Sequence, residues 1–140
     1  MVQEAKINNA EKALGFILAG NATFTLRSLK TGSRYTYKVR QADDKPLWFV
    51  NLLTGPDNNS DYTYLGLVSD NTFRLTKKSQ MTDDSVPVVA FRWFLGKLVQ
   101  QTIPEQVELW HAGRCGRCGR TLTVPESVES GFGPECVTKI

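Results

Sequence analysis

Cysteine and histidine are scarce in this 140-residue chain, which has three cysteines and one histidine. All three cysteines follow residue 114, and an odd number excludes the self-contained disulfide framework of small secreted domains. A membrane-spanning helix needs about 18 or more apolar residues, whereas the longest candidate run, residues 13–19, has seven. The first six residues also lack the basic and apolar regions of a signal peptide. We therefore expect a soluble cytoplasmic protein that does not contact a membrane.

Acidic residues are missing from residues 22–41, although this stretch contains five basic ones: Arg27, Lys30, Arg34, Lys38 and Arg40. The whole chain has a formal net charge of only +3, and many proteins reach such a charge without binding nucleic acid. The charge is therefore informative through its position in the chain and not through its size.

The apolar pattern predicts an α+β fold, with an antiparallel sheet of about five strands packed by one or two helices. We place this α+β domain at residues 1–104 and a small zinc-knuckle tail at residues 105–140. Hydrophobic residues form 41% of the chain, as in ordinary globular domains. Alternating or continuous apolar runs predict strands at residues 23–27, 34–40, 47–53, 62–68 and 72–76.

Two helices are predicted on either side of these strands. The first covers residues 10–19, with Asn8 or Asn9 as its cap and Gly20 at its end. The second begins after a cap at Asp84 or Ser85 and ends before Pro104. We expect it to cover the sheet with a stripe made of Val88, Phe91, Leu95, Leu98 and Val99, widened by Trp93 and Phe94.

Residues 23–27 and 34–40 alternate regularly and flank a turn at residues 30–33, so they predict a hairpin with two different faces. One face would join the core through Phe24, Leu26, Tyr35, Tyr37 and Val39. The opposite face would present hydroxyl groups and cations, which suit a phosphate backbone. A solvated face that merely keeps the protein soluble is the alternative. The residues of this second face are Thr23, Thr25, Arg27, Thr36, Lys38 and Arg40.

The tail has the spacing of a metal site, His111-x3-Cys115-x2-Cys118-x17-Cys136. A Cys-x2-Cys turn directs two thiolates at one ion, and a third cysteine and a histidine complete the tetrahedral set of structural zinc sites. We therefore expect one structural Zn²⁺, with His111, Cys115, Cys118 and Cys136 as its ligands.

Other interpretations of the tail remain open. Three free thiols are one, and a redox-active Cys-x2-Cys is a weaker one, because no βαβ pattern accompanies the motif. If His111 is not a ligand, Glu129, Glu135 or a water molecule would replace it. Three basic residues, Arg114, Arg117 and Arg120, either balance the excess negative charge of the thiolates or contact phosphate.

Residues 113–120 (GRCGRCGR) together with Leu122, residues 125–127 and residues 131–136 (GFGPEC) resemble a small, largely uncharacterised zinc-knuckle domain. Such domains occur in bacterial and bacteriophage proteins. The resemblance covers residues 110–140 and implies a metal-binding module in a phage or mobile-element context, hence the cytoplasm of a host cell. It brings no defined activity with it.

We expect no enzymatic activity and no small-molecule substrate, because the chain lacks phosphate-binding, nucleophile-elbow and His-Glu-x-x-His motifs. A reserve hypothesis gives Glu126, Glu129 or Glu135 the role of a general base if His111 is not a ligand. The polar residues 54–61 form either a plain connection or a functional loop, and they lack the glycine and glutamate of a calcium-binding EF-hand loop.

Two functions remain. The first is a module that binds nucleic acid through Arg27, Arg34, Lys38 and Arg40 on the sheet and Arg114, Arg117 and Arg120 on the knuckle. The second is a protein-binding inhibitor or adaptor, such as a phage blocker of a host defence complex of the anti-CRISPR type. Steep salt dependence of binding would favour the first function.

Overall fold

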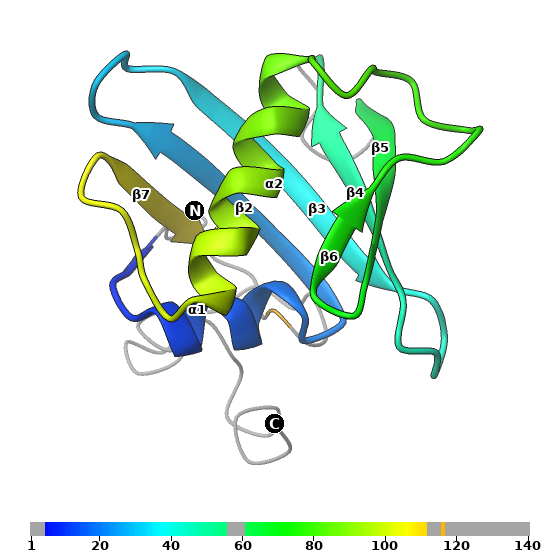
Figure 1. Cartoon of the computed structure of the whole chain (residues 1–140), viewed down its shortest axis with the longest axis horizontal. Helices are drawn as coiled ribbons and strands as arrows, with labels where there is room; N and C mark the ends of the chain where they lie inside the picture. Colours follow the sequence, from blue (N-terminus) through cyan, green and yellow to red (C-terminus); the bar gives the residue numbers. More distant parts are fainter. Residues whose placement is uncertain (1–4, 56–60, 112–115, 117–140) are drawn as a thin grey trace.

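The computed structural model describes residues 5–55, 61–111 and 116 of the chain (Figure 1). Within these residues, two helices and a seven-stranded antiparallel sheet are present. The helices are α1 (Ala10–Ile17) and α2 (Val86–Val99). The strands are β1 (Ala5–Ile7), β2 (Asn21–Ser28), β3 (Arg34–Gln41), β4 (Trp48–Leu53), β5 (Tyr62–Ser69), β6 (Thr72–Arg74) and β7 (Val107–His111).

The sheet has the order β1-β7-β2-β3-β4-β5-β6, so β2 to β6 form a meander and β7 returns after α2 to lie between β1 and β2. The fold class is α+β as predicted, but the prediction of about five strands was too low. β1 has only three residues, which is too short to show a period. β7 is stabilised by pairing with β1 and β2, whose residues are roughly 80 to 105 positions away in sequence, and no local signal specifies such distant partners. The sheet therefore extends beyond residue 104, where we placed the boundary of the tail.

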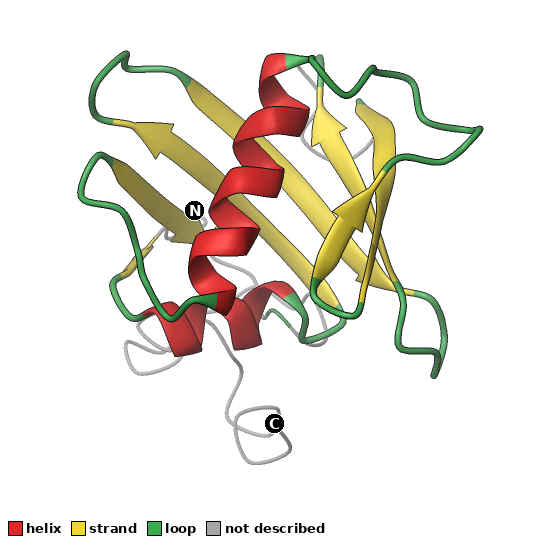
Figure 2. Ribbon diagram, viewed as in Figure 1, coloured by secondary structure: helices red, strands yellow, loops and turns green. Residues whose placement is uncertain are grey.

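Helix α2 lies across β2 and β3 on one face of the sheet, which we call the covered face (Figures 1 and 2). Its cap is Ser85, one of the two predicted candidates, and Pro87 stands in its first turn. The predicted stripe was too wide, because Trp93 is 39% exposed and Val99 is 42% exposed. An α-helix turns by about 100° per residue, so Trp93 points almost opposite to Phe91. The buried side is made of Val88, Phe91, Phe94, Leu95 and Leu98.

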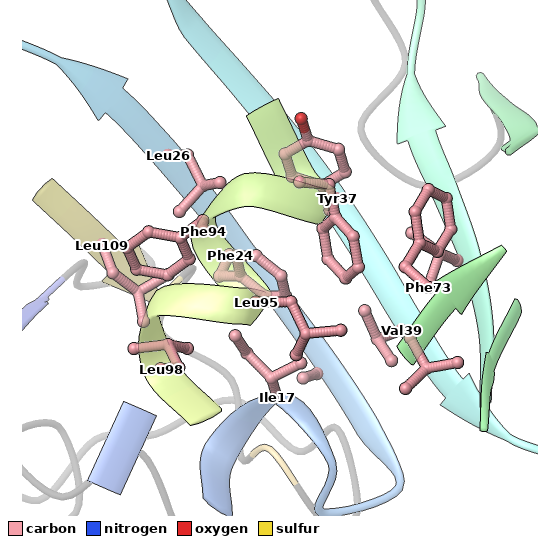
Figure 3. Packing of buried hydrophobic residues seen from close by; sticks show 14 of the residues in the cluster. Ile17, Phe24, Leu26, Tyr37, Val39, Phe73, Phe94, Leu95, Leu98 and Leu109 are labelled. Carbon is pink, nitrogen blue, oxygen red and sulfur yellow. The ribbon is translucent and has the colours of Figure 1, made fainter. Parts of the chain in front are cut away.

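Aromatic rings from sheet and helix form the centre of the core (Figure 3). The ring of Phe91 on α2 lies 5.1 Å from that of Tyr37, 4.9 Å from that of Phe73 and 6.4 Å from that of Phe24. The Tyr37 hydroxyl donates a hydrogen bond to the Pro87 carbonyl oxygen at 2.6 Å, and burial raises the pKa of Tyr37 well above its ordinary value. This contact fixes the N-terminal end of α2 over β3.

Helix α1 begins where predicted and ends earlier. The Asn9 side chain accepts a hydrogen bond from the Lys12 amide at 3.0 Å, as an N-cap does. The helix ends at Ile17 with Leu18 as its C-cap, two residues short of the predicted end. Its buried residues include Phe16, and Figure 2 shows the helix below the C-terminal end of α2.

Candidate functional site

The sheet presents a second face, turned away from α2, which we call the outer face. The predicted core residues of the hairpin are on the covered side, since Phe24, Leu26, Tyr37 and Val39 are buried and Tyr35 is partly buried. Alternation along each strand then assigns their neighbours to the outer face. The register confirms the predicted hairpin and pairs Asn21 with Arg40, Thr23 with Lys38, Thr25 with Thr36, and Arg27 with Arg34.

All the positive charge of the described strands lies on this outer face. The seven strands contain six Lys or Arg residues and one acidic residue, Glu108. In the register of the sheet, each basic residue stands opposite another residue of the outer face. For example, Lys6 stands opposite Trp110, and Arg74 stands opposite Leu67. The six basic residues are Lys6, Arg27, Arg34, Lys38, Arg40 and Arg74.

Aromatic side chains share the outer face with these cations. Tyr64 stands opposite Asn51, and its ring meets the edge of Phe49 at 6.2 Å. The Lys38 ammonium lies 5.2 Å from the centre of the Tyr62 ring, a cation–π distance. Trp110 on β7 stands opposite Thr25 on β2. None of these four aromatic residues was predicted as a site residue, although alternation in β4 and β7 would have placed Phe49 and Trp110 on this face.

The outer face contains a cleft of about 210 Å³, lined by Thr25, Arg27, Arg34 and Trp110 from three neighbouring strands. We call it the outer-face cleft. The hydroxyl group of Thr25, one of the lining residues, forms a hydrogen bond of 2.7 Å with that of Thr36. Two arginines and one indole ring around a small depression form a site suited to an anion attached to a flat ring.

Glu108 lies beside this cleft and holds three neighbouring groups. Its carboxylate is 2.9 Å from the Lys6 ammonium and 3.8 Å from the Arg27 guanidinium, and it accepts a hydrogen bond from the Trp110 indole at 3.4 Å. The hydrogen bond from Lys6 is the main reason why the pKa of Glu108 is lowered, although partial burial opposes it. The carboxylate therefore stays charged and orients Trp110.

The metal-site prediction falls mostly outside the described residues. Six of the predicted site residues lie outside the part of the chain that the structure describes: Cys115, Cys118, Cys136, Arg114, Arg117 and Arg120. His111 is described: it is the last residue of β7 and is fully buried. Among the described residues, no three His, Cys, Asp or Glu side chains come together to hold a metal.

Two residues of the motif nevertheless contact the same side chain. The His111 ring lies 5.7 Å from the ring of Phe16. Gly116 packs so closely on Phe16 that a Cβ there would lie 2.6 Å from a ring carbon. The Gly116 carbonyl oxygen also accepts a hydrogen bond from the Asn21 amide at 2.8 Å. Two residues near the start of the motif, His111 and Gly116, are thus held beside α1.

A second cavity, of about 310 Å³, lies on the covered side between α2, β7 and the turn of the β2–β3 hairpin. Apolar side chains such as Tyr35, Val86 and Trp93 line it, with Lys30 at its border. Near it, Leu29 is 51% exposed and Val86 is 63% exposed. This apolar surface contrasts with the charged outer face.

The described residues define an α+β protein with an open antiparallel sheet, one face covered by a helix and the other basic and aromatic. The sequence model of DUF6011, a family of unknown function, matches residues 111–140, in agreement with an uncharacterised C-terminal domain. No curated protein and no solved structure matches the chain. In the described part of the chain, neither helix is long and apolar enough to cross a membrane.

Proposed function

We propose that this protein is a non-enzymatic binding module that contacts nucleic acid through the outer face of its sheet. The observation that carries the proposal is the segregation of charge, because all six basic residues of the described strands share the face that α2 leaves open. Folding does not require this arrangement. Like charges that oppose each other across strands, such as Arg27 and Arg34, destabilise a sheet.

Nucleic acid is the partner whose chemistry fits both parts of this face. Arginine, lysine and threonine side chains are common donors to backbone phosphates, and aromatic rings stack on unpaired bases. A face that served solubility alone would need the charges, but not Phe49, Tyr64 and Trp110 among them.

The experiment compares two variants that each lose three positive charges. The first carries Arg27→Gln, Lys38→Gln and Arg40→Gln on the outer face. The second, its control, carries Lys77→Gln, Lys78→Gln and Lys97→Gln, which lie after β6 and on α2. Binding to labelled DNA and RNA is measured by fluorescence anisotropy at several salt concentrations.

We expect the outer-face variant to fold normally and to bind more weakly, about equally across sequences. Its salt dependence should flatten by about one unit per lost phosphate contact, while the control variant should bind almost like the unmodified protein. If both variants bound nucleic acid equally weakly, the loss of affinity would be due to the net charge of the protein alone, and the proposal would be refuted.

We further propose that the tail binds one structural Zn²⁺ through His111, Cys115, Cys118 and Cys136. Three thiolates and an imidazole are a donor set that zinc prefers. The contacts of His111 and Gly116 with Phe16 support the proposal, because they hold one expected ligand and a residue of the Cys-x2-Cys turn against the same side chain. The arginines at positions 114, 117 and 120 would then lie on the knuckle, available to phosphate.

Elemental analysis of the purified protein tests the zinc proposal. We expect close to one zinc per chain, and its loss in Cys115→Ser, Cys118→Ser or Cys136→Ser. Because metal binding and folding of a small knuckle are coupled, chelation should change the amide spectrum of the tail and leave the sheet in place. The zinc proposal would be disproved if the purified protein contained no metal and the amide spectrum of its tail did not change on addition of a chelator.

A second candidate, the protein-binding inhibitor or adaptor, is favoured by the apolar surface around Leu29, Val86 and Trp93, since exposed apolar patches often mark protein contacts. The two candidates differ in one measurement. A partner that co-purifies after nuclease treatment, binds with little salt dependence and is indifferent to the outer-face variant would favour the inhibitor.

A further inference from the structure

The outer-face cleft is the place where the two chemistries of the outer face meet. Trp110 comes from β7, Thr25 and Arg27 from β2, and Arg34 from β3. Thr25 stands opposite Trp110, and Arg27 stands opposite Arg34. One indole and two guanidinium groups therefore border a depression of about 210 Å³ on three adjacent strands.

The charges around this cleft are unbalanced. Arg27 shares Glu108 with Lys6, and the contact to Lys6 is the shorter, at 2.9 Å against 3.8 Å. Among the residues that the structure describes, no carboxylate lies within ion-pair distance of Arg34. Two arginines directly opposite each other repel, and an anion placed between them would turn this repulsion into attraction. Arginine suits phosphate in particular, because its planar fork of donors matches two phosphate oxygens.

The indole of Trp110 is held in place at the border of the same cleft. Its Nε1 donates to Glu108 at 3.4 Å, and Glu108 is itself held by Lys6. An indole fixed in this way is a suitable surface for a base, because stacking needs a ring that is already in position.

We propose that the outer-face cleft binds a single unpaired nucleotide, with its base stacked on Trp110 and its phosphate between Arg27 and Arg34. A base within a duplex is stacked between its neighbours and cannot reach such a ring. The partner of the outer face is therefore single-stranded nucleic acid. This inference rests on the proposed nucleic-acid binding and specifies the kind of nucleic acid.

The first test uses a mixed-sequence single-stranded DNA and its duplex at one fixed salt concentration. We expect the single strand to bind more tightly than the duplex. Trp110→Leu should weaken binding to the single strand by about 5- to 150-fold, the range that loss of one base stack produces. Trp110→Phe, which keeps an aromatic ring, should restore most of the affinity.

Controls separate stacking from loss of stability. Trp93→Leu removes an exposed tryptophan on α2, 39% exposed and away from the outer face, and should leave binding unchanged. Arg34→Gln changes an exposed side chain and should weaken binding, while the midpoint of thermal unfolding stays the same or rises slightly, because the substitution removes the repulsion from Arg27. Arg34→Gln thus keeps the proposal testable if Trp110→Leu does not fold.

Tryptophan fluorescence gives a signature that a purely structural role of Trp110 would not produce. The chain has three tryptophans, at positions 48, 93 and 110. The single strand should quench the emission of the unmodified protein and of Trp93→Phe, and this quenching should be absent in Trp110→Phe.

The outcomes distinguish this inference from the proposed function. If the triple variant at positions 27, 38 and 40 binds weakly while Trp110→Leu and Arg34→Gln bind normally, the outer face binds nucleic acid but the cleft holds no nucleotide. Equal affinity for duplex and single strand would also overturn the inference. If no nucleic acid binds the unmodified protein, the proposed function and the inference both fail.

Discussion

The two faces of the β2–β3 hairpin are built from neighbouring residues and yet differ in every respect. Along β2, the buried Phe24 and Leu26 alternate with Thr23, Thr25 and Arg27. The covered face packs against α2 through a cluster of aromatic rings. The outer face instead carries hydroxyl groups and cations, which stand opposite one another across the two strands.

The difference shows which face folding needs. Burial of apolar area drives folding, so the covered face is constrained by packing and tolerates few changes. The outer face contributes little to the core, and the opposition of Arg27 and Arg34 even acts against the sheet. Residues that the fold does not require are the ones to examine for binding.

Adjacent substitutions on β2 give the largest expected contrast between the faces. Phe24→Ala removes a fully buried ring that lies 5.8 Å from Tyr37 and 6.4 Å from Phe91, and should lower the free energy of unfolding by about 3–5 kcal/mol. Thr23→Ala, one residue away on the outer face, should lower it by about 1 kcal/mol or less. Urea denaturation followed by circular dichroism measures both, and similar losses would show that the two faces are not distinct.

An added methyl group should change stability in opposite directions on the covered face and on the exposed side of α2, by less than the loss of the Phe24 ring. A Cβ at Gly66 on β5 would overlap the carbonyl oxygen of Arg74 on β6, so Gly66→Ala should destabilise the protein by about 1–3 kcal/mol. At Gly96 on α2, nothing lies within 4 Å of an added Cβ, and Gly96→Ala should stabilise it by about 1 kcal/mol. Thermal unfolding checks the two opposite signs. Destabilisation by both would mean that the exposed side of α2 is also packed.

Local patterns explain which parts of the fold could be predicted. The hairpin was predicted with its faces because its alternation extends over several residues without a break. The turn between its strands contains Gly32, whose positive φ of 76° suits glycine. The position of α2 followed from its helical spacing, whereas Val99 was misassigned because it ends the helix at the edge of the apolar stripe.

Pairing between distant segments explains what could not be predicted. β1 and β7 join the sheet through each other and through β2, and no local sequence signal specifies such a partner. Alternation within β7 assigns Trp110 to the outer face, but its neighbour Thr25 on β2 follows only from this long-range pairing. The metal ligands stay a prediction, because Cys115, Cys118 and Cys136 lie outside the described residues.

The smallest expected effect concerns Glu108, the one acidic residue of the described strands. The hydrogen bond from Lys6, with the nearby Trp110 and Arg27, lowers the pKa of Glu108 in the folded protein. Since the folded pKa lies below the unfolded one, the stabilisation is present above the ordinary glutamate pKa of about 4.3 and is lost as the pH falls through the folded value. Lys6→Gln should raise the Glu108 pKa toward its ordinary value, as measured by NMR titration of the carboxyl carbon.

Lys97→Gln is the matched control for this titration, because it removes the same charge from α2 instead of from the outer face. It should leave the Glu108 pKa unchanged. A response to Lys97→Gln as large as the response to Lys6→Gln would assign the shift to the net charge of the whole protein. A response to Lys6→Gln alone would show that the charges of the outer face act locally, which the orientation of Trp110 by Glu108 requires.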